Sequence, residues 1–192
     1  MKTKVLVTGG SGFIGSKFIE SLKKYGEELD FIVNLRNENV DVFKSKRHIF
    51  IYNDIIDSFH FSGKIDILFH VASETKEEDK MWSTNYGGTT NVMRWAIKAG
   101  VKKVIYMSSV AVYGENNKKI ISGFSKCAPV TTYGKSKLCA EKYVAEICTK
   151  NKVQYFILRP SNIIDINDIH SCHLLQFIKS IRMSRINDFF PS

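Results

Sequence analysis

The 192-residue chain lacks any apolar run near the about 18 residues that a transmembrane helix needs. It has few cysteines and no C-x-x-C pair, so we expect free thiols rather than disulfides or a zinc site. His170 and His173 would share a helix face, but no further ligand lies near them in the sequence, and we expect no metal. Linkers rich in Pro, Gly or Ser and internal repeats are also missing. These absences exclude membrane-spanning, disulfide-rich and fibrous proteins and leave an ordinary globular chain.

The first residues begin like a signal peptide, but the apolar stretch ends at Val7, before an apolar signal region is complete. We therefore interpret it as the first strand of a cytoplasmic protein. Lysine and arginine number 28 against 19 acids, a net charge of +9, which favours anionic partners such as nucleotides or sugar nucleotides. The basic residues form no stripe interleaved with aromatics, so we expect neither nucleic acid nor a membrane as partner.

Short apolar runs alternate with longer helical stretches along the chain. Strands are predicted at residues 4–7, 31–35, 48–52, 65–70, 104–107 and 153–158, and helices at 13–22, 82–99, 135–150 and 170–186. Strands that are apolar throughout are typical of a sheet buried on both faces. The alternation predicts an α/β fold with a doubly wound parallel sheet and right-handed crossovers.

A glycine-rich turn follows the first predicted strand. Gly9, Gly12 and Gly15 have G-x-x-G-x-x-G spacing, and Phe13 and Ile14 open the next helix. The first glycine permits a tight turn, the second lets the backbone approach a pyrophosphate, and the third lets the helix pack close to the strand. The helix N-terminus then offers N–H groups to phosphates. The spacing between a strand and a helix predicts a dinucleotide site that includes all five residues.

The residues at the end of the second predicted strand bear on the choice between NAD and NADP. An acid there would hold the adenosine ribose, but this chain has Asn34, followed by Leu35 and Arg36. Without a carboxylate a 2′-phosphate is not repelled, and Arg36 could pair with it through a bidentate, charge-assisted contact. The residues leave NAD and NADP open and slightly favour NADP.

Tyr133 and Lys137 are four residues apart, a spacing that puts both on one face of a helix. A nearby ammonium favours phenolate, which would let Tyr133 exchange a proton with an alcohol or ketone. Ser109 follows the fifth predicted strand, at the edge where ligands sit in open α/β sheets. A serine there can bind the reacting oxygen, so we expect Ser109, Tyr133 and Lys137 to be catalytic.

Together these segments resemble the extended short-chain dehydrogenase/reductase family, the NAD(P)-dependent sugar-nucleotide epimerases and dehydratases. The resemblance covers residue 4 to about residue 162. Its motifs are T-G-x-x-G-x-x-G at 8–15, D-[IVL] at 54–55, H-x-A-[AG] at 70–73, N-x-x-G-T-x-N at 85–91, S-[ST]-x-x-V-Y-G at 108–114, Y-x-x-x-K at 133–137 and R-P/Y-x-N at 159–162.

The resemblance implies a role for each matched residue. Tyr133 would be the general acid/base, Lys137 would lower its pKa and hold the nicotinamide ribose, and Ser109 would bind the substrate oxygen. Hydride would pass between a substrate carbon and the nicotinamide, and an epimerase would return it to the opposite face. Asn162 would reach the substrate. The further cofactor contacts implied are Asp54, Ile55, Val71, Ala72, Ser73, Asn85 and Ser161.

The chain departs from the family pattern at three places. Asn34 and Arg36 replace the acidic strand end, and Ser73 with a charged run at 74–79 follows the H-x-A position. The third departure is length, because only one predicted helix follows Asn162, whereas the family's last third supplies most of the substrate pocket. We expect an NAD(P)-binding Rossmann domain at 1–162 and the start of a truncated substrate region at 163–192.

Three functions stay open. The full motif set favours an NAD(P)-dependent epimerase or dehydratase that acts on a nucleotide sugar. Arg36 supports an NADP-dependent carbonyl reductase of the same superfamily, and the short C-terminal region supports a truncated, non-catalytic dinucleotide-binding module. The resemblance also implies a possible homodimer through the helix that bears Tyr133 and the helix before it.

Overall fold

The computed structural model describes residues 2–22, 28–36, 48–57, 59–115, 120–161 and 163. Contacts divide the chain into two units, Met1–Arg159 and Pro160–Ser192, and each is considered by itself. The helix predicted at 170–186, with His170 and His173, lies outside the described residues. Among the described residues, no group of three or more His, Cys, Asp or Glu side chains is placed to hold a metal ion.

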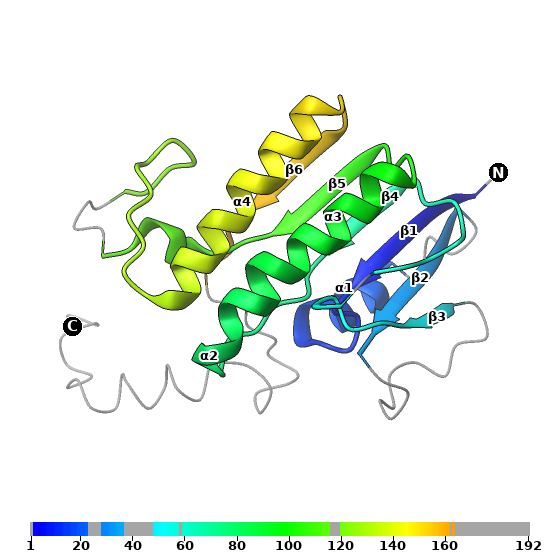
Figure 1. Ribbon diagram of the computed structural model, residues 1–192, viewed down its shortest axis with the longest axis horizontal. Helices are drawn as coiled ribbons and strands as arrows, with labels where there is room; N and C mark the ends of the chain where they lie inside the picture. Colours follow the sequence, from blue (N-terminus) through cyan, green and yellow to red (C-terminus); the bar gives the residue numbers. More distant parts are fainter. Residues whose placement is uncertain are drawn as a thin grey trace, which may run out of the picture. The chain divides into compact units, whose positions relative to one another are not determined.

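Six parallel strands form one sheet in the order β3-β2-β1-β4-β5-β6 (Figure 1). They are β1 (Thr3–Thr8), β2 (Leu29–Leu35), β3 (Ile49–Tyr52), β4 (Ile67–His70), β5 (Lys103–Met107) and β6 (Gln154–Leu158). The predicted parallel sheet is confirmed, with small shifts at the strand ends. The strand order reverses at β1, which pairs with β2 on one side and β4 on the other, and ligands bind at such a switch point.

The helices differ more from the sequence prediction. They are α1 (Phe13–Ser21), α2 (Glu78–Met81), η2 (Trp82–Gly88), α3 (Thr89–Lys98), η3 (Val110–Tyr113) and α4 (Thr132–Lys150). The segments α2, η2 and α3 follow one another without a break, and η2 is π-helical, a feature that the prediction of a helix at 82–99 missed. The longest apolar helical stretch in the described part of the chain is still too short or too polar to cross a membrane.

The helix predicted at 135–150 begins earlier, at Thr132. The Thr131 side-chain oxygen accepts a hydrogen bond from the Gly134 N–H at 3.1 Å, which caps the helix at that point. The earlier start places Tyr133 and Lys137 within α4, so the expected one-face spacing is present.

Both faces of the sheet are covered by helices. Figure 1 shows α3 and α4 side by side across one face, with α1 on the other. Strand residues that alternate in sequence pack on opposite faces: Leu6, Ile32, Leu68 and Val104 lie under α3 and α4, whereas Val5, Val7, Val33 and Phe69 lie on the side of α1. Burial on both sides explains why these strands are apolar at nearly every position.

Gly15 lies where α1 passes closest to the turn after β1. A Cβ at Gly15 would lie 2.3 Å from the Gly9 carbonyl oxygen and 3.0 Å from the Gly10 Cα. The third glycine of the motif therefore permits close packing of the helix on the turn.

We expect Gly15→Ala to lower the free energy of unfolding by about 1–3 kcal/mol, because the new methyl group would press against backbone atoms. Chemical denaturation measures the change. Gly123→Ala is the matched control, since a Cβ at Gly123 meets nothing within 4 Å. Equal stability of the two variants would contradict the close approach.

Candidate active site

The predicted site residues gather at one edge of the sheet, at the carboxyl ends of the strands. The glycine turn follows β1, Asn34 and Arg36 stand at the end of β2, Asp54 and Ile55 follow β3, residues 71–73 follow β4, and Ser109 follows β5. Ligands bind at this edge in open parallel sheets. Ser161 belongs to the second unit, and Asn162 lies outside the described residues.

The glycine turn lies against the ends of the two neighbouring strands. Gly9 has a φ of +69°, and a Cβ there would lie 2.7 Å from the Ala72 nitrogen and Cα. The Gly10 N–H donates to the Asn34 carbonyl at 3.4 Å. Gly12 is the N-cap of α1, and no side chain caps the helix. A turn in which Ser11 is flanked by glycines, followed by a helix end with no side-chain cap, fits the phosphates of a dinucleotide.

The ends of β2 and β3 place the predicted adenosine contacts in different surroundings. Asn34 is buried, and its Nδ2 donates to the Asn53 carbonyl at 3.1 Å. Arg36 is exposed, and its Nε lies 3.8 Å from the Asp54 carboxylate. Ile55 is buried in the core under α3 rather than exposed at the sheet edge. Arg36 and Asp54 are thus the charged groups of the predicted set at this end of the site.

Asn91 holds the loop after β3, a role that the sequence analysis did not assign. Its Nδ2 donates to the carbonyl oxygens of Ile55, Ile56 and Asp57, at 3.2, 2.7 and 2.9 Å. The last residue of the N-x-x-G-T-x-N motif therefore fixes the loop that carries Asp54. The motif itself was the available signal, but the partner was not predictable because it lies more than thirty residues away.

His70 joins the glycine turn to the helix that follows η2. Its Nδ1 lies 2.6 Å from the Thr8 hydroxyl and its Nε2 lies 2.9 Å from the Thr89 hydroxyl. The Thr89 hydroxyl donates to the Asn85 carbonyl at 2.6 Å, so it accepts from Nε2–H, and Nδ1 accepts from Thr8. Burial lowers the pKa of His70 to about 3, and the charge of Lys137 acts in the same direction. His70 is therefore a neutral link.

The low pKa of His70 makes the fold sensitive to acid. The folded-state pKa of about 3 lies below the ordinary value of 6.5, so the unfolded chain takes up the proton first. Stability from neutral His70 is present above pH 6.5 and is lost as the pH falls towards 3, by an amount on the order of a few kcal/mol. We expect the Tm of the wild type to fall more steeply across this window than that of His70→Gln.

The matched control is His60→Gln, at an exposed position, which should keep the wild-type slope. Parallel curves for the wild type and His70→Gln would show that burial of His70 does not drive acid unfolding.

Two serines lie close to Tyr133. Ser73 follows β4 and Ser109 is the N-cap of η3, and both are near enough to act on the pKa of Tyr133. The Ser109 Oγ also accepts from the Ala111 N–H at 3.2 Å. Burial raises the pKa of Tyr133 above its ordinary value, and the nearby Ser73 and Ser109 act against that rise. The structure thus brings together Ser109 and Tyr133, as predicted, and adds Ser73, which was expected only at the cofactor.

Lys137 lies one turn beyond Tyr133 and is buried. Its Nζ donates to the Met107 carbonyl at 2.5 Å and lies 4.5 Å from the centroid of the Tyr106 ring. Burial lowers the pKa of Lys137 to about 7, while Glu141 acts to raise it. Lys137 is thus held at the end of β5.

Asn85, in the π-helical segment, links the loop after β4 to the first turn of α4. Its Oδ1 accepts from the Ser73 hydroxyl at 3.0 Å and from the Glu74 N–H at 2.7 Å. Its Nδ2 donates to the Glu74 carbonyl at 3.0 Å and to the Ser136 hydroxyl at 3.1 Å, and Ser136 donates to the Tyr133 carbonyl at 2.8 Å. The predicted cofactor contact is therefore occupied by protein partners, and π segments are common at functional sites.

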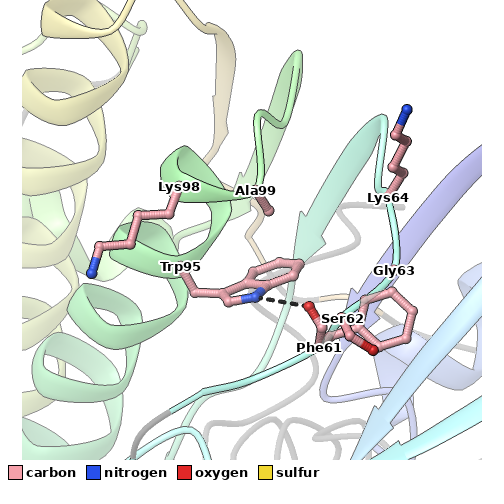
Figure 2. Close-up of a pocket in the computed structure, with 7 residues that line it drawn as sticks. All are labelled: Phe61, Ser62, Gly63, Lys64, Trp95, Lys98 and Ala99. Atoms are coloured by element: carbon pink, nitrogen blue, oxygen red, sulfur yellow. Dashed lines mark hydrogen bonds between the residues drawn. The ribbon is translucent and has the colours of Figure 1, made fainter.

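A cavity of about 310 Å³ lies elsewhere in the domain (Figure 2). Figure 2 shows the Trp95 indole pointing at the Phe61 carbonyl, to which it donates at 3.2 Å. The lining residues are Phe61, Ser62, Gly63, Lys64, Trp95, Lys98 and Ala99. These residues precede β4 or end α3, so they lie at the amino-terminal edge of the sheet, away from Tyr133. The candidate active site is therefore the group around Tyr133.

The strand order and the glycine turn define an α/β domain with the Rossmann-like doubly wound fold. More particularly, the chain belongs to the NAD dependent epimerase/dehydratase family, whose model matches residues 5–184. The family resemblance predicted from the motifs is confirmed.

Similar proteins carry the same fold. The chain is 32% identical over 202 residues to dTDP-D-glucose 4,6-dehydratase of Mus musculus, covering 95% of this chain and 56% of that protein. A crystal structure of UDP-galactose 4-epimerase is similar with a TM-score of 0.81 and 26% identity, covering 95% of this chain and 63% of that one. The Bordetella bronchiseptica enzyme WbmG in complex with NAD has a TM-score of 0.70 and 25% identity, covering 83% and 53%. The chain spans about half the length of the curated relatives it matches.

Proposed function

We propose that this chain carries the cofactor site and the acid/base site of an NAD(P)-dependent epimerase or dehydratase that acts on a nucleotide sugar. The placement of Tyr133 and Lys137 on one turn of α4, close to Ser109 at the carboxyl end of β5, carries the proposal. The names of the relatives support the substrate class, since they act on dTDP-glucose or UDP-galactose. The proposal keeps a dinucleotide-binding domain at 1–162 and the start of a substrate region at 163–192.

In the proposed mechanism Tyr133 exchanges a proton with the reacting hydroxyl of the sugar. The Ser109 Oγ accepts from the Ala111 N–H, which leaves its O–H to donate to the reacting oxygen or to Tyr133. A bound nicotinamide supplies the hydride acceptor. Because the pKa of Lys137 is about 7, its amine is partly protonated near neutral pH, and this charge favours the phenolate of Tyr133.

The glycine turn is the proposed pyrophosphate site. The backbone at Gly9 and Gly12 and the start of α1, with Phe13 and Ile14, would face the phosphates, while Gly15 keeps the helix close. Further contacts proposed for the cofactor are Val71, Ala72, Ser73 and Ser161, with Asn85 as the buried group that holds Ser73, and Asn162 is proposed for the substrate.

Tyr133→Phe should lower turnover of UDP-glucose, UDP-galactose or dTDP-glucose by at least about 100-fold, because the acid/base group is removed. Cofactor affinity, measured by NADH fluorescence, should stay nearly unchanged. Tyr155→Phe, on β6 and away from the serines, is the matched control and should keep wild-type turnover. Wild-type turnover in Tyr133→Phe would remove Tyr133 from the acid/base role.

The proposed cofactor is NAD or NADP, with NADP slightly favoured by Arg36. The family and the WbmG complex support a nicotinamide dinucleotide. The Arg36 Nε lies 3.8 Å from the Asp54 carboxylate, and the arginine side chain is exposed. If Arg36 left Asp54 to pair with a 2′-phosphate, the lost ion pair would therefore cost little free energy.

Arg36→Ala should weaken NADP(H) binding at least about 10-fold more than NAD(H) binding, because a charge-assisted contact to the 2′-phosphate is lost. Fluorescence titrations with NADPH and NADH measure the two affinities. Arg94→Ala, at an exposed position on α3, is the matched control. Equal losses for the two cofactors would mean that Arg36 does not contact the 2′-phosphate.

A second candidate function, NADP-dependent carbonyl reduction, is favoured by Arg36 alone. A reductase must exchange its nicotinamide in every turnover, whereas an epimerase retains it, so retention of labelled cofactor through turnover separates the two. The third candidate, a non-catalytic dinucleotide-binding module, requires saturable cofactor binding without turnover of any nucleotide sugar.

The homodimer also remains a proposal, through α4 and the helical run before it. Trp82 and Tyr86 on η2 are exposed, and their ring centroids lie 6.3 Å apart. Tyr143 on α4 continues this aromatic group, 6.4 Å from Tyr86. Exposed aromatic groups that span two neighbouring helices are typical of protein interfaces.

A further inference from the structure

Arg159 directly follows β6 and is the last residue of the first unit. Its guanidinium joins three separate segments, through Glu141 on α4, Tyr113 at the end of η3, and Gly123 in the loop between η3 and α4. We propose that Arg159 is a positioning residue of the acid/base site, which fixes η3 against α4 and thereby sets where the Ser109 hydroxyl lies relative to Tyr133. The inference rests on the proposed function.

A bidentate contact to a buried carboxylate holds the guanidinium in place. The Arg159 Nε and Nη2 donate to the two carboxylate oxygens of Glu141 at 2.9 and 2.6 Å, and Glu141 is 2% exposed. Because a guanidinium is planar and rigid, this contact also fixes the direction of its remaining N–H groups. The Arg159 Nη1 donates to the Tyr113 hydroxyl at 2.8 Å and to the Gly123 carbonyl at 3.3 Å. A lysine ammonium has no rigid set of donors, so the arrangement requires arginine.

The segment that carries Ser109 is attached to the end of β6 at two points. Before Ser109, the Ser108 N–H donates to the Leu158 carbonyl at 2.7 Å. At the end of η3, the Tyr113 hydroxyl accepts from Arg159, the residue after Leu158. The first contact is between backbone atoms and holds the start of the segment. The second depends on one side chain and decides how η3 is turned.

The short helix η3 lies directly on the first turn of α4. A Cβ at Gly134 would lie 2.5 Å from the Ala111 carbonyl oxygen, so the two backbones approach closely beside Tyr133. The Ala111 N–H donates to the Ser109 Oγ at 3.2 Å, so the backbone of η3 also holds that side chain. Because η3 has only four residues, freeing its far end at Tyr113 would let it pivot on the contact with α4 and would move Ser109.

Stability alone is a weak explanation for this ion pair. Removing the Glu141 carboxylate and the Arg159 guanidinium from water costs free energy that offsets much of their attraction, so apolar side chains of similar size would stabilise the packing as well. An ion pair with fixed hydrogen-bond directions instead specifies one arrangement of the segments that it joins. That arrangement matters for turnover, since a displacement of about 1 Å in the reacting groups can lower the rate about 100-fold.

The first measurement is amide hydrogen exchange in the whole chain, followed by NMR, and it needs no turnover. Tyr113→Phe removes the hydroxyl that Arg159 holds and keeps the ring, whose centroid lies 5.0 Å from the Arg159 Cζ. Exchange at Ala111 should become about 5-fold faster, because the freed η3 opens more often. Val144, fully buried in the middle of α4, reports opening of the whole domain and should change less. Tyr155→Phe, on β6, is the matched control and should leave both rates unchanged.

Unchanged exchange at Ala111 in Tyr113→Phe would overturn the proposal. An equal rise at Ala111 and Val144 would also overturn it, since the substitution would then loosen the whole domain rather than η3.

The second measurement is turnover of UDP-glucose, UDP-galactose or dTDP-glucose. Tyr113→Phe should lower kcat about 10-fold and leave KM and cofactor affinity nearly unchanged, because it misplaces a reacting group and removes no binding contact. In a chain that already carries Ser109→Ala, Tyr113→Phe should lower kcat no further, because the hydroxyl that it misplaces is gone. Arg159→Lys keeps a positive charge beside Glu141 without the rigid donors and should behave like Tyr113→Phe. Equal losses of kcat with and without Ser109→Ala would contradict the positioning role.

The two measurements separate this inference from the proposed function. Faster exchange at Ala111 in a chain whose turnover is absent or ignores Tyr133→Phe refutes the proposed function alone. Turnover that depends on Tyr133 but is unchanged in Tyr113→Phe refutes the role of Arg159 alone.

Discussion

The Asn85 side chain is fully buried and uses all four of its hydrogen-bonding positions, and the geometry of the site depends on them. Two of these bonds hold the backbone of Glu74, one holds Ser73, and one reaches the first turn of α4 through Ser136. The loop after β4 and the helix that carries Tyr133 are therefore fixed to the same amide. Each of the two amide atoms holds two partners, so the four partners are constrained together.

Burial acts on the ionisable groups of the site in a consistent direction. It lowers the pKa values of His70 and Lys137 and raises that of Tyr133, so in each case it favours the uncharged form. The buried carboxylate of Glu141 is paired with the half-buried guanidinium of Arg159 through two contacts. A charge that arrives with a ligand therefore acts in surroundings with little screening. For Tyr133 the raising effect of burial is the larger, and the nearby Ser73 and Ser109 act against it.

Local patterns were sufficient for much of the fold. The apolar strands were predictable because burial on both faces excludes polar residues along them. The spacing of Gly9, Gly12 and Gly15 likewise predicted a tight turn, in which a Cβ at Gly9 or Gly15 would meet backbone atoms. The spacing of Tyr133 and Lys137 was also visible, because an α-helix repeats on a known period. The π-helical segment η2 was not predictable, since its sequence has no hydrophobic period that separates it from an ordinary α-helix.

The sequence by itself determined the class of fold, the glycine turn and the residue types needed for acid/base chemistry, because each depends on neighbours within a few positions. Only the tertiary structure decided which of these residues meet. Thr8 and His70 are 62 residues apart, and Asn85 and Ser136 are 51 apart, so their contacts exist only because the sheet sets β1 beside β4 and because α4 packs against η2. A hydrogen bond between distant residues depends on the packing of the elements that carry them, and no local pattern in the sequence encodes that packing.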